Sequence, residues 1–499
     1  MRGDRFLKPL WNGVWLEERL LLWVVRGFRL VTSKAGGRAV LAFSLLLLLA
    51  IGVVGWGRDM RDDAFVTYRY ARNLIEGRGF VFNEGQQDLG TTAPLYGLLL
   101  AGLGLFHENI PLISHVLSVL SVAWIAWMGY RIFSKSLVSW AGLLFAFLIC
   151  VDGFIPSIWG MEAPFQCALI LAGFFALRCK RWFLAGILIG IAVWVRVDAV
   201  IFLMALGCSF LLTGDKDLLK TLAVACLLAG LGAGLCFVLY GSPFPTSATA
   251  KAVQALNPRW PGFGGRIDEH FLLHMPLLIP FLATGAFAAL TRHRSFSPIL
   301  FWGMGHGMAY ALWRVPAYDW YFVPLTVSGV VLACLGVHYL LGNNPSAKGA
   351  LVLTVVLAVH AGCQMLDIRS EFFIHDGPRR VNRYRVYREV AAWIEENAPE
   401  EASVGIFEIG VVGYHTSRKV IDFCGLVHPE AVPHLKNLDY LWIFRHFKPD
   451  FLCVGEEPRD AMVKVVESPE FQQGYVERYR SQHGVYCIVV YGKEEVTIQ

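Results

Sequence analysis

Two adjacent acids are the first candidates for chemistry in this sequence. Asp62 and Asp63 follow Arg61, which lies five residues beyond the first long apolar run. Neighbouring carboxylates at the edge of such a run are costly unless water, a positive partner or a bound cation stabilises them. On a helix, Asp62 would share a face with Phe65 and Arg69, so the carboxylate and the guanidinium can meet. A second explanation stays open, in which the acids only stabilise a helix N-terminus.

The elements that must position these acids are mostly apolar. Of the 499 residues, 56% are hydrophobic and 17% are charged, whereas an ordinary soluble domain has about 25% charged residues. The net charge of +5 is spread along the chain, which argues against a nucleic-acid-binding face. We expect eleven membrane-spanning helices, three of them short enough to be tilted or screened from lipid. The runs are 39–56, 111–130, 137–155, 164–177, 183–195, 199–213, 219–240, 271–290, 296–312, 321–341 and 349–366.

Cations in the short loops predict the orientation of these spans. Alternate loops carry Lys or Arg, and loops of this kind face the cytoplasm. The basic segment 1–37, with its tryptophans, is expected to be an amphipathic helix on the cytoplasmic face. Residues 38–366 then form the transmembrane module. An odd number of spans places the first outer loop, 57–110, on the same outer side as residues 367–499. The tryptophans are Trp11, Trp15 and Trp23, and the loop cations are Arg131, Lys135, Arg178, Lys180, Arg181, Lys216, Lys220, Arg292, Arg294 and Lys348.

Residues 367–499 differ in pattern from the rest of the chain. A helix is expected at Tyr384–Asn397, where apolar residues recur on one face. Four short β-branched runs alternate with helical segments, which is typical of a small α/β domain. The expected strands are Ser403–Phe407, Lys419–Phe423, Asp450–Gly455 and Val485–Tyr491, and the helical segments include Leu438–Phe447 and Asp460–Val466. A disulfide among Cys424, Cys453 and Cys487 stays open.

Several motifs resemble those of polytopic membrane glycosyltransferases of the GT-C type. The run DDAFVTYRYARNLIEGRGFVFNEGQQDLGTTAPLYGLLLA, which begins at Asp62, is similar to their first outer loop. The family closest to it contains the terminal β-arabinofuranosyltransferases. The pair Thr246-Ser247 and the single residue Val197 differ from the usual pattern of that family. Further matching stretches are Trp159–Pro164, Val195–Asp198, Tyr240–Pro245 with Ala250-Lys251, Glu408–Gly410 and Asp422–Leu426.

The resemblance implies a GT-C fold and transfer of a sugar, with arabinofuranose as a candidate, from a polyprenyl-phosphate donor. The acceptor would be a cell-envelope glycan, lipid or protein outside the bacterial inner membrane. An outer-loop acid would act on the acceptor or on the anomeric carbon, and we expect Asp62 to matter more than Asp63. Cations would stabilise the leaving phosphate. The phosphate-binding candidates are Lys251, Arg69, Arg196 and Arg314, and the substrate-binding candidates are Glu162, Asp198, Tyr68, Thr91 and Thr92.

Each candidate also has an ordinary structural explanation. Arg69 would then pair only with the nearby acids, Arg196 with Asp198, while Lys251 would reach lipid headgroups and Arg314 would anchor a helix end. Asp62 and Asp63 could instead hold Mg²⁺, Mn²⁺ or Ca²⁺, which prefer oxygen ligands. His306 is interpreted as a packing residue.

Two other function classes remain as alternatives. A transporter or flippase for an envelope lipid or glycan often shows repeated halves, and the sequence has no visible repeat. A scaffold would leave the acidic outer-loop motif unexplained.

Overall fold

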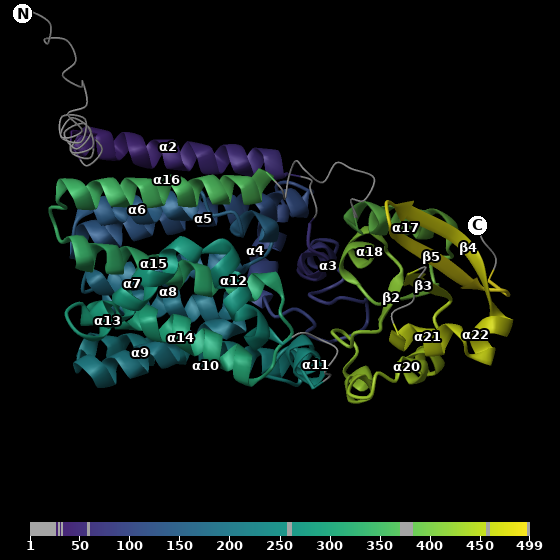
Figure 1. Cartoon of the computed structure of the whole chain (residues 1–499). Coiled ribbons are helices and arrows are strands. Elements are labelled where there is room, and N and C mark those ends of the chain that lie inside the picture. The colour runs from purple at the N-terminus through teal and green to yellow at the C-terminus, as the bar shows by residue number, and fades with distance from the viewer. Residues whose placement is uncertain are drawn as a thin grey trace, which may run out of the picture.

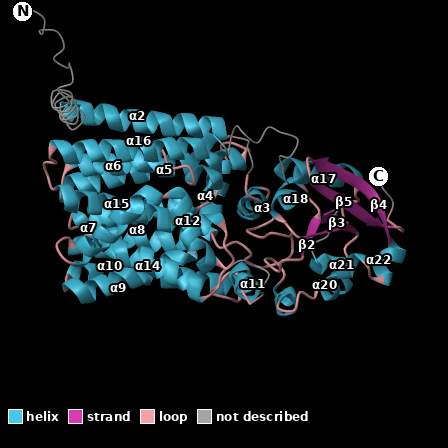
Figure 2. Ribbon diagram, in the orientation of Figure 1, coloured by secondary structure: helices cyan, strands magenta, loops and turns pink. Residues whose placement is uncertain are grey.

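The computed structural model describes residues 26, 27, 30, 33–56, 60–256, 262–369, 383–455 and 460–496. Two parts lie side by side: a bundle of roughly parallel helices, and a smaller domain that contains the sheet (Figure 1). Figure 2 shows that the strands lie only in the smaller domain among the described residues. The expected segment 1–37 falls almost wholly outside the described residues.

The apolar runs fold as the helices of the bundle. Asn109 caps α5 by accepting a hydrogen bond from the backbone of Leu112, and left-handed Gly214 and Gly241 end α9 and α10. The bundle contains α2 (Lys34–Gly55), α4 (Pro94–Gly104), α5 (Ile110–Ser136), α6 (Ser139–Cys150), α7 (Ala163–Arg178), α8 (Trp182–Val195), α9 (Val200–Thr213), α10 (Lys216–Tyr240), α12 (Ile267–His274), α13 (Ile279–Leu290), α14 (Ser297–Leu312), α15 (Val323–Leu341) and α16 (Ala347–Arg369).

The run 271–290 differs from the expected single helix. Among the described residues, five helices are long and apolar enough to cross a membrane by themselves, and a sixth candidate is bent by 89° where α12 meets the segment leading into α13. Pro276 lies at this break and cannot continue the hydrogen-bond ladder of α12. Five shorter apolar helices are also present among the described residues, and one of them, Pro94–Gly104, lies in the stretch 57–110, the expected outer loop. The total of eleven spans and their orientation stay predictions.

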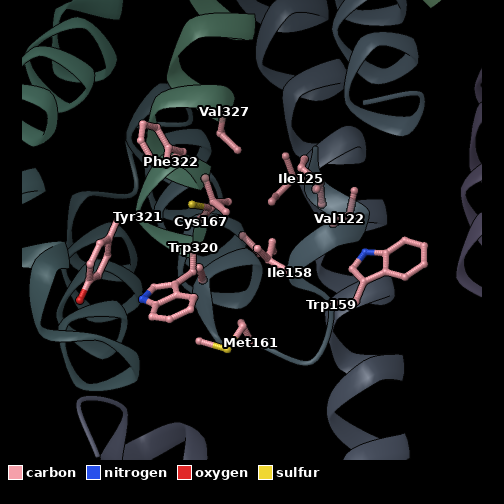
Figure 3. Close-up of a cluster of buried hydrophobic side chains, with 14 of the residues drawn as sticks. Val122, Ile125, Ile158, Trp159, Met161, Cys167, Trp320, Tyr321, Phe322 and Val327 are labelled. Atoms are coloured by element: carbon pink, nitrogen blue, oxygen red, sulfur yellow. The ribbon is translucent and has the colours of Figure 1, made fainter. Parts of the chain in front are cut away.

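Close helix packing and a buried apolar cluster hold the bundle together. A Cβ atom on Gly285 of α13 would lie 1.8 Å from the backbone oxygen of Leu332 in α15, so this crossing requires glycine. Figure 3 shows Ile158, Met161 and Trp320 in a cluster that also includes side chains from α5 and α7. All three are buried. The cluster supports the loops that end near the acids.

The smaller domain is an α/β sandwich with a five-stranded sheet in the order β2-β1-β3-β5-β4. The first three of these strands are parallel, and β5 pairs antiparallel with both β3 and β4. The bounds are α17 (Arg383–Asn397), β1 (Ser403–Ile406), α18 (Gly410–His415), β2 (Lys419–Asp422), α19 (Val432–Leu435), α20 (Tyr440–Phe447), β3 (Phe451–Gly455), α21 (Asp460–Val466), α22 (Pro469–Gly474), β4 (Tyr475–His483) and β5 (Tyr486–Lys493).

The expected α/β class of this domain is confirmed, with one strand added. Sequence patterns do not predict β4, because it is an edge strand with several exposed polar positions and little apolar alternation. Two further helices, α3 (Asp62–Ile75) and α11 (Thr246–Gln254), lie between the bundle and the domain (Figure 1). These two helices carry the acid pair and Lys251.

Candidate active site

The first acid of the pair joins the bundle to the smaller domain. Asp62 begins α3, and its two carboxylate oxygens accept hydrogen bonds from the backbone N–H groups of Gly410 (2.8 Å) and Val411 (2.7 Å). These groups begin helix α18, where N–H donors have no partner within the helix. Only glycine fits at position 410, since a Cβ atom there would lie 1.8 Å from the backbone oxygen of Asp62.

The environment of Asp62 favours a bound proton. Burial, helped by the charges of Glu408 and Asp63 and opposed by the two N–H donors, raises the pKa of the Asp62 carboxyl from 3.8 to about 8. A carboxyl whose pKa lies near neutrality is suited to proton transfer.

The second acid of the pair points to a lysine. Lys251 of α11 donates to Oδ1 of Asp63 at 3.2 Å. The ammonium also lies 4.9 Å, 5.1 Å and 5.8 Å from the ring centres of Tyr318, Trp320 and Tyr321. Burial lowers the pKa of this lysine, but the charge of Asp63 and the two phenols outweigh burial and raise it above its ordinary value. Lys251 is therefore a fixed cation.

Both acids and Lys251 line one cavity of about 270 Å³ between the bundle and the smaller domain. The smaller domain contributes a carboxylate and a phenol to it, and the hydroxyl of Tyr387 donates to Glu408 at 2.8 Å. The wall is otherwise rich in aromatic side chains. The lining residues are Met60, Arg61, Asp62, Asp63, Val66, Lys251, Gln254, Tyr318, Trp320, Arg383, Tyr384, Tyr387, Phe407, Glu408, Ile409, Val411, Cys424 and Leu426.

A second, smaller cavity of about 30 Å³ shares Asp63 and Lys251 with the first. Three expected substrate-binding residues line it, namely Thr91, Thr92 and Glu162. The hydroxyls of Thr91 and Thr67 lie 2.8 Å apart. The structure therefore brings these residues to the acid pair, although they are distant in sequence.

Arg196 and Asp198 form a closed network behind Glu162. The guanidinium of Arg196 donates to Glu162 at 2.5 Å and to Asp198 at 2.8 Å. Tyr310 donates to the same carboxylate of Asp198 at 2.7 Å. Neither Arg196 nor Asp198 lines the two cavities. The tight pair expected between Arg196 and Asp198 is present, and Glu162 extends it.

Arg69 does not meet Asp62, which corrects the expected pairing along α3. Its guanidinium is buried and donates to the backbone oxygens of Phe82, Gly413 and Arg418 and to the side chain of Asn83. The physical reason is that α18 takes up the carboxylate of Asp62, while backbone carbonyls of both parts surround Arg69. This arginine ties α3 to the smaller domain.

The remaining expected residues lie away from the cavity. Tyr68 is buried and donates to the backbone oxygen of Gly160 at 2.7 Å, so its hydroxyl fixes the loop that precedes Glu162. Arg314 is exposed, has a left-handed backbone, and lines neither cavity. His306 is buried, bonds the backbone oxygen of Tyr321 at 2.9 Å and stacks on Tyr310, consistent with packing.

Some lining residues escape sequence reasoning. Ser247 and Gln254 are buried and each has a side-chain oxygen without a described hydrogen-bond partner. Their position one helical turn to either side of Lys251 was a usable signal, as was the aromatic segment around Trp320. Glu408 lies in one of the stretches that resemble the GT-C family, Glu408–Gly410, but only the fold brings it to the acids.

Metal binding and a disulfide were both left open by the sequence. Among the described residues, no three His, Cys, Asp or Glu side chains form a group that could hold a metal ion. A divalent cation at Asp62 and Asp63 stays an untested alternative. The thiol of Cys424 donates to the backbone oxygen of Phe407 at 3.0 Å, and Cys453 is buried in β3.

Comparisons with known proteins place the architecture. Residues 374–498 match a family described as a domain of unknown function (DUF8728). No curated protein matches the sequence. The oligosaccharyltransferase of Archaeoglobus fulgidus, in a complex with a tethered acceptor peptide, is similar in structure with a TM-score of 0.61. It is 15% identical, and the match covers 93% of this chain and 75% of that one.

A second solved structure matches over almost its whole length. ArnT from Cupriavidus metallidurans bound to undecaprenyl phosphate matches with a TM-score of 0.54 and 13% identity, over 93% of this chain and 99% of that chain. The chain has the GT-C fold. It is a multi-pass membrane protein with a C-terminal sheet domain.

Proposed function

We propose that this protein transfers a sugar from a polyprenyl-phosphate carrier to an acceptor at the outer surface of the membrane. The observation that carries the proposal is the cavity in which a fixed cation, Lys251, lies beside two carboxylates. Two similar structures have lipid phosphates bound: dolichol-phosphate in a complex of the A. fulgidus enzyme and undecaprenyl phosphate in ArnT. We therefore expect the phosphate of a lipid-linked donor to bind beside Lys251 in this cavity.

The two acids and the lysine have separate roles in the proposed reaction. The acceptor hydroxyl oxygen forms a bond to the anomeric carbon, and the bond from that carbon to the phosphate oxygen breaks. The electron pair leaves with the polyprenyl phosphate, whose charge Lys251 stabilises. The proton of the acceptor passes to Asp62, whose raised pKa suits it to act as the base. Asp63 holds Lys251 in place until the donor phosphate arrives.

Hydrogen-bonding groups beside the acids suit a sugar. Thr91, Thr92, Glu162 and Ser247, whose hydroxyl has no described hydrogen-bond partner, line the smaller cavity. That cavity has about the volume of one water molecule, so these groups can bind a hydroxyl of a sugar whose ring lies in the larger cavity beside Asp63 and Lys251. Arabinofuranose is the first sugar to test, because the outer-loop motif resembles that of the arabinofuranosyltransferases. The acceptor would be an envelope glycan, lipid or protein on the outer side of the bacterial inner membrane, where the smaller domain would also lie.

The direct test is incubation of purified protein with a panel of polyprenyl-phosphate sugars, measuring release or transfer of the sugar. We expect at least one donor to be turned over, and Asp62→Asn to reduce that turnover at least about a hundredfold, the low end for loss of a general base. EDTA in one arm tests whether transfer requires a divalent cation. Turnover of no donor in the panel, or near-normal turnover by Asp62→Asn, would contradict the proposal.

A further inference from the structure

A separate cavity of about 510 Å³ lies on the other side of Met60 and Tyr384 from the candidate active site. Those two residues line both cavities. The remaining walls come from the outer ends of α2 and α5, from α3, and from α17 and α18 of the smaller domain. The lining residues are Trp56, Met60, Arg72, Asn109, Pro111, Tyr384, Arg388, Tyr414 and His415. Helix α11, which carries Lys251, contributes no residue to this lining, and α3 lies between α11 and α2 (Figure 1).

The charge of this second cavity is one-sided. Among its described lining residues, Arg72 and Arg388 are cations and none is a carboxylate. Arg388 is exposed, with its guanidinium 5.6 Å from the ring centre of Tyr384, and no ion pair involves it in the described part of the chain. Arg72 donates to the backbone oxygen of Tyr414 at 2.5 Å and to Glu76, which lies outside the lining. Arginine guanidinium groups match the geometry of phosphate oxygens.

The remaining titratable side chain of the wall, His415, is neutral. The Nε2 atom of His415 is buried and has no described hydrogen-bond partner. Burial lowers the pKa of His415 to about 4, and the positive charges of Arg388 and Arg72 lower it as well. The imidazole is therefore neutral at pH 7 and adds no charge to the wall. Both arginines lie close enough to His415 to affect its protonation.

The rim of the cavity lies where lipid headgroups are expected. Trp56 ends α2 and Asn109 caps α5, two of the helices long and apolar enough to cross a membrane. Val53, one turn before Trp56, is 78% exposed, as expected for a lipid-facing position. Tryptophan is enriched at the membrane–water interface. An anion that enters here comes most directly from the membrane surface.

We infer that the cavity bounded by α2, α5, α17 and α18 binds the phosphate of a membrane lipid headgroup. Arg72 and Arg388 contact the phosphate oxygens, and Trp56 packs on the upper part of the acyl chains. This inference does not depend on the proposed sugar transfer. A headgroup held here lies against Met60 and Tyr384, the wall shared with the candidate active site.

The test measures lipid binding to the full chain in neutral detergent by isothermal titration calorimetry. The ligands are dioctanoyl phosphatidic acid, dioctanoylglycerol, which lacks the phosphate, and inorganic phosphate. We expect only phosphatidic acid to bind well, and the variant R72Q/R388Q to bind it at least about tenfold more weakly, as for loss of charge-assisted hydrogen bonds. The matched control R385Q/R445Q removes the same charge from exposed positions that already have acidic partners, and binding should not change.

Two results would overturn the inference. Equal affinity of R72Q/R388Q and the parent chain would exclude these arginines as the phosphate ligands. Binding of dioctanoylglycerol or of inorganic phosphate as tight as that of phosphatidic acid would exclude a lipid phosphate as the ligand. If R72Q/R388Q does not fold, R388Q alone is measured, because Arg388 is exposed and its described contacts are with Tyr384. R388Q should then weaken binding severalfold, and an unchanged affinity contradicts the inference.

Discussion

Arg196, which is buried, and Lys251, which is half-buried, are cations near the same loops, but their surroundings differ. Arg196 has two carboxylate partners, and all three side chains are at most 8% exposed. Lys251 has one carboxylate partner, Asp63, whose side chain is 32% exposed, and the ammonium lines a cavity. Aromatic rings, rather than further acids, surround the rest of the ammonium.

This difference indicates which of the two cations, Arg196 or Lys251, can bind a ligand. A buried cation with two acids has its charge neutralised and its donors occupied, so an incoming phosphate would have to displace a carboxylate from the protein interior. A lysine with one partially exposed acid can exchange that acid for a phosphate at lower cost. Arg196 is thus interpreted as structural and Lys251 as functional. The predictions below test this contrast and the roles of the two acids beside Lys251.

The largest effect should come from Arg196→Met, which leaves Glu162 and Asp198 buried without their cation. We expect a loss of about 3–5 kcal/mol in the free energy of unfolding, typical of breaking a buried ion pair. Thermal unfolding of the purified variant measures it. Arg196→Lys should recover only part of the loss, because a lysine cannot reproduce the two-pronged geometry. An unchanged melting temperature would remove the structural assignment.

Lys251→Gln should reduce sugar transfer by about a hundredfold or more, as for loss of one preorganised group that stabilises the leaving charge. Its melting temperature should stay close to that of the parent, because the carboxylate of Asp63 remains partially solvated. Steady-state kinetics and thermal unfolding together check this. Lys251→Arg retains the charge and serves as the matched control. A variant that loses stability as much as Arg196→Met would contradict the contrast.

The pH dependence of transfer should follow Asp62. Since only the ionised carboxylate accepts a proton, kcat/KM should fall about tenfold for each unit below about pH 8. The same shift affects stability: between about pH 4 and pH 8 the folded chain holds a proton that the unfolded chain has released. This contribution to stability is fully present below about pH 4 and is lost as the pH rises through about 8. A flat rate profile from pH 6 to 8 would exclude Asp62 as the base.

Asp63→Asn should have the smallest effect on transfer, a decrease of about tenfold or less, because Lys251 keeps its charge and its aromatic surroundings. The KM for the donor is the informative constant, since removing the competing carboxylate frees Lys251 for phosphate. A decrease larger than that of Asp62→Asn would reverse the roles of the two acids. Asp62→Asn also loses one acceptor for the N–H groups of α18, so its melting temperature is needed as a control.

Local sequence patterns anticipated much of the architecture. Runs of apolar residues predicted most helices of the bundle, but not α4, which lies in the expected outer loop 57–110. Alternating short runs predicted four of the five strands. They did not predict β4, because an edge strand with polar positions lacks the alternation that burial imposes. They also missed the break between α12 and α13, since an apolar run reads the same whether its helix is straight or bent at Pro276.

The sequence by itself determined which residues could carry charge at the edge of the apolar runs. A charged side chain near lipid is energetically costly, so its presence there indicates a partner or a function. Asp62, Asp63, Glu162 and Lys251 were identifiable in this way. Only the tertiary structure decided their partners. Asp62 accepts a hydrogen bond from the start of α18, almost 350 positions away along the chain. Arg69 donates hydrogen bonds to backbone carbonyls instead of to an acid. Such contacts depend on how the smaller domain packs on α3, and local sequence patterns carry no information about that packing.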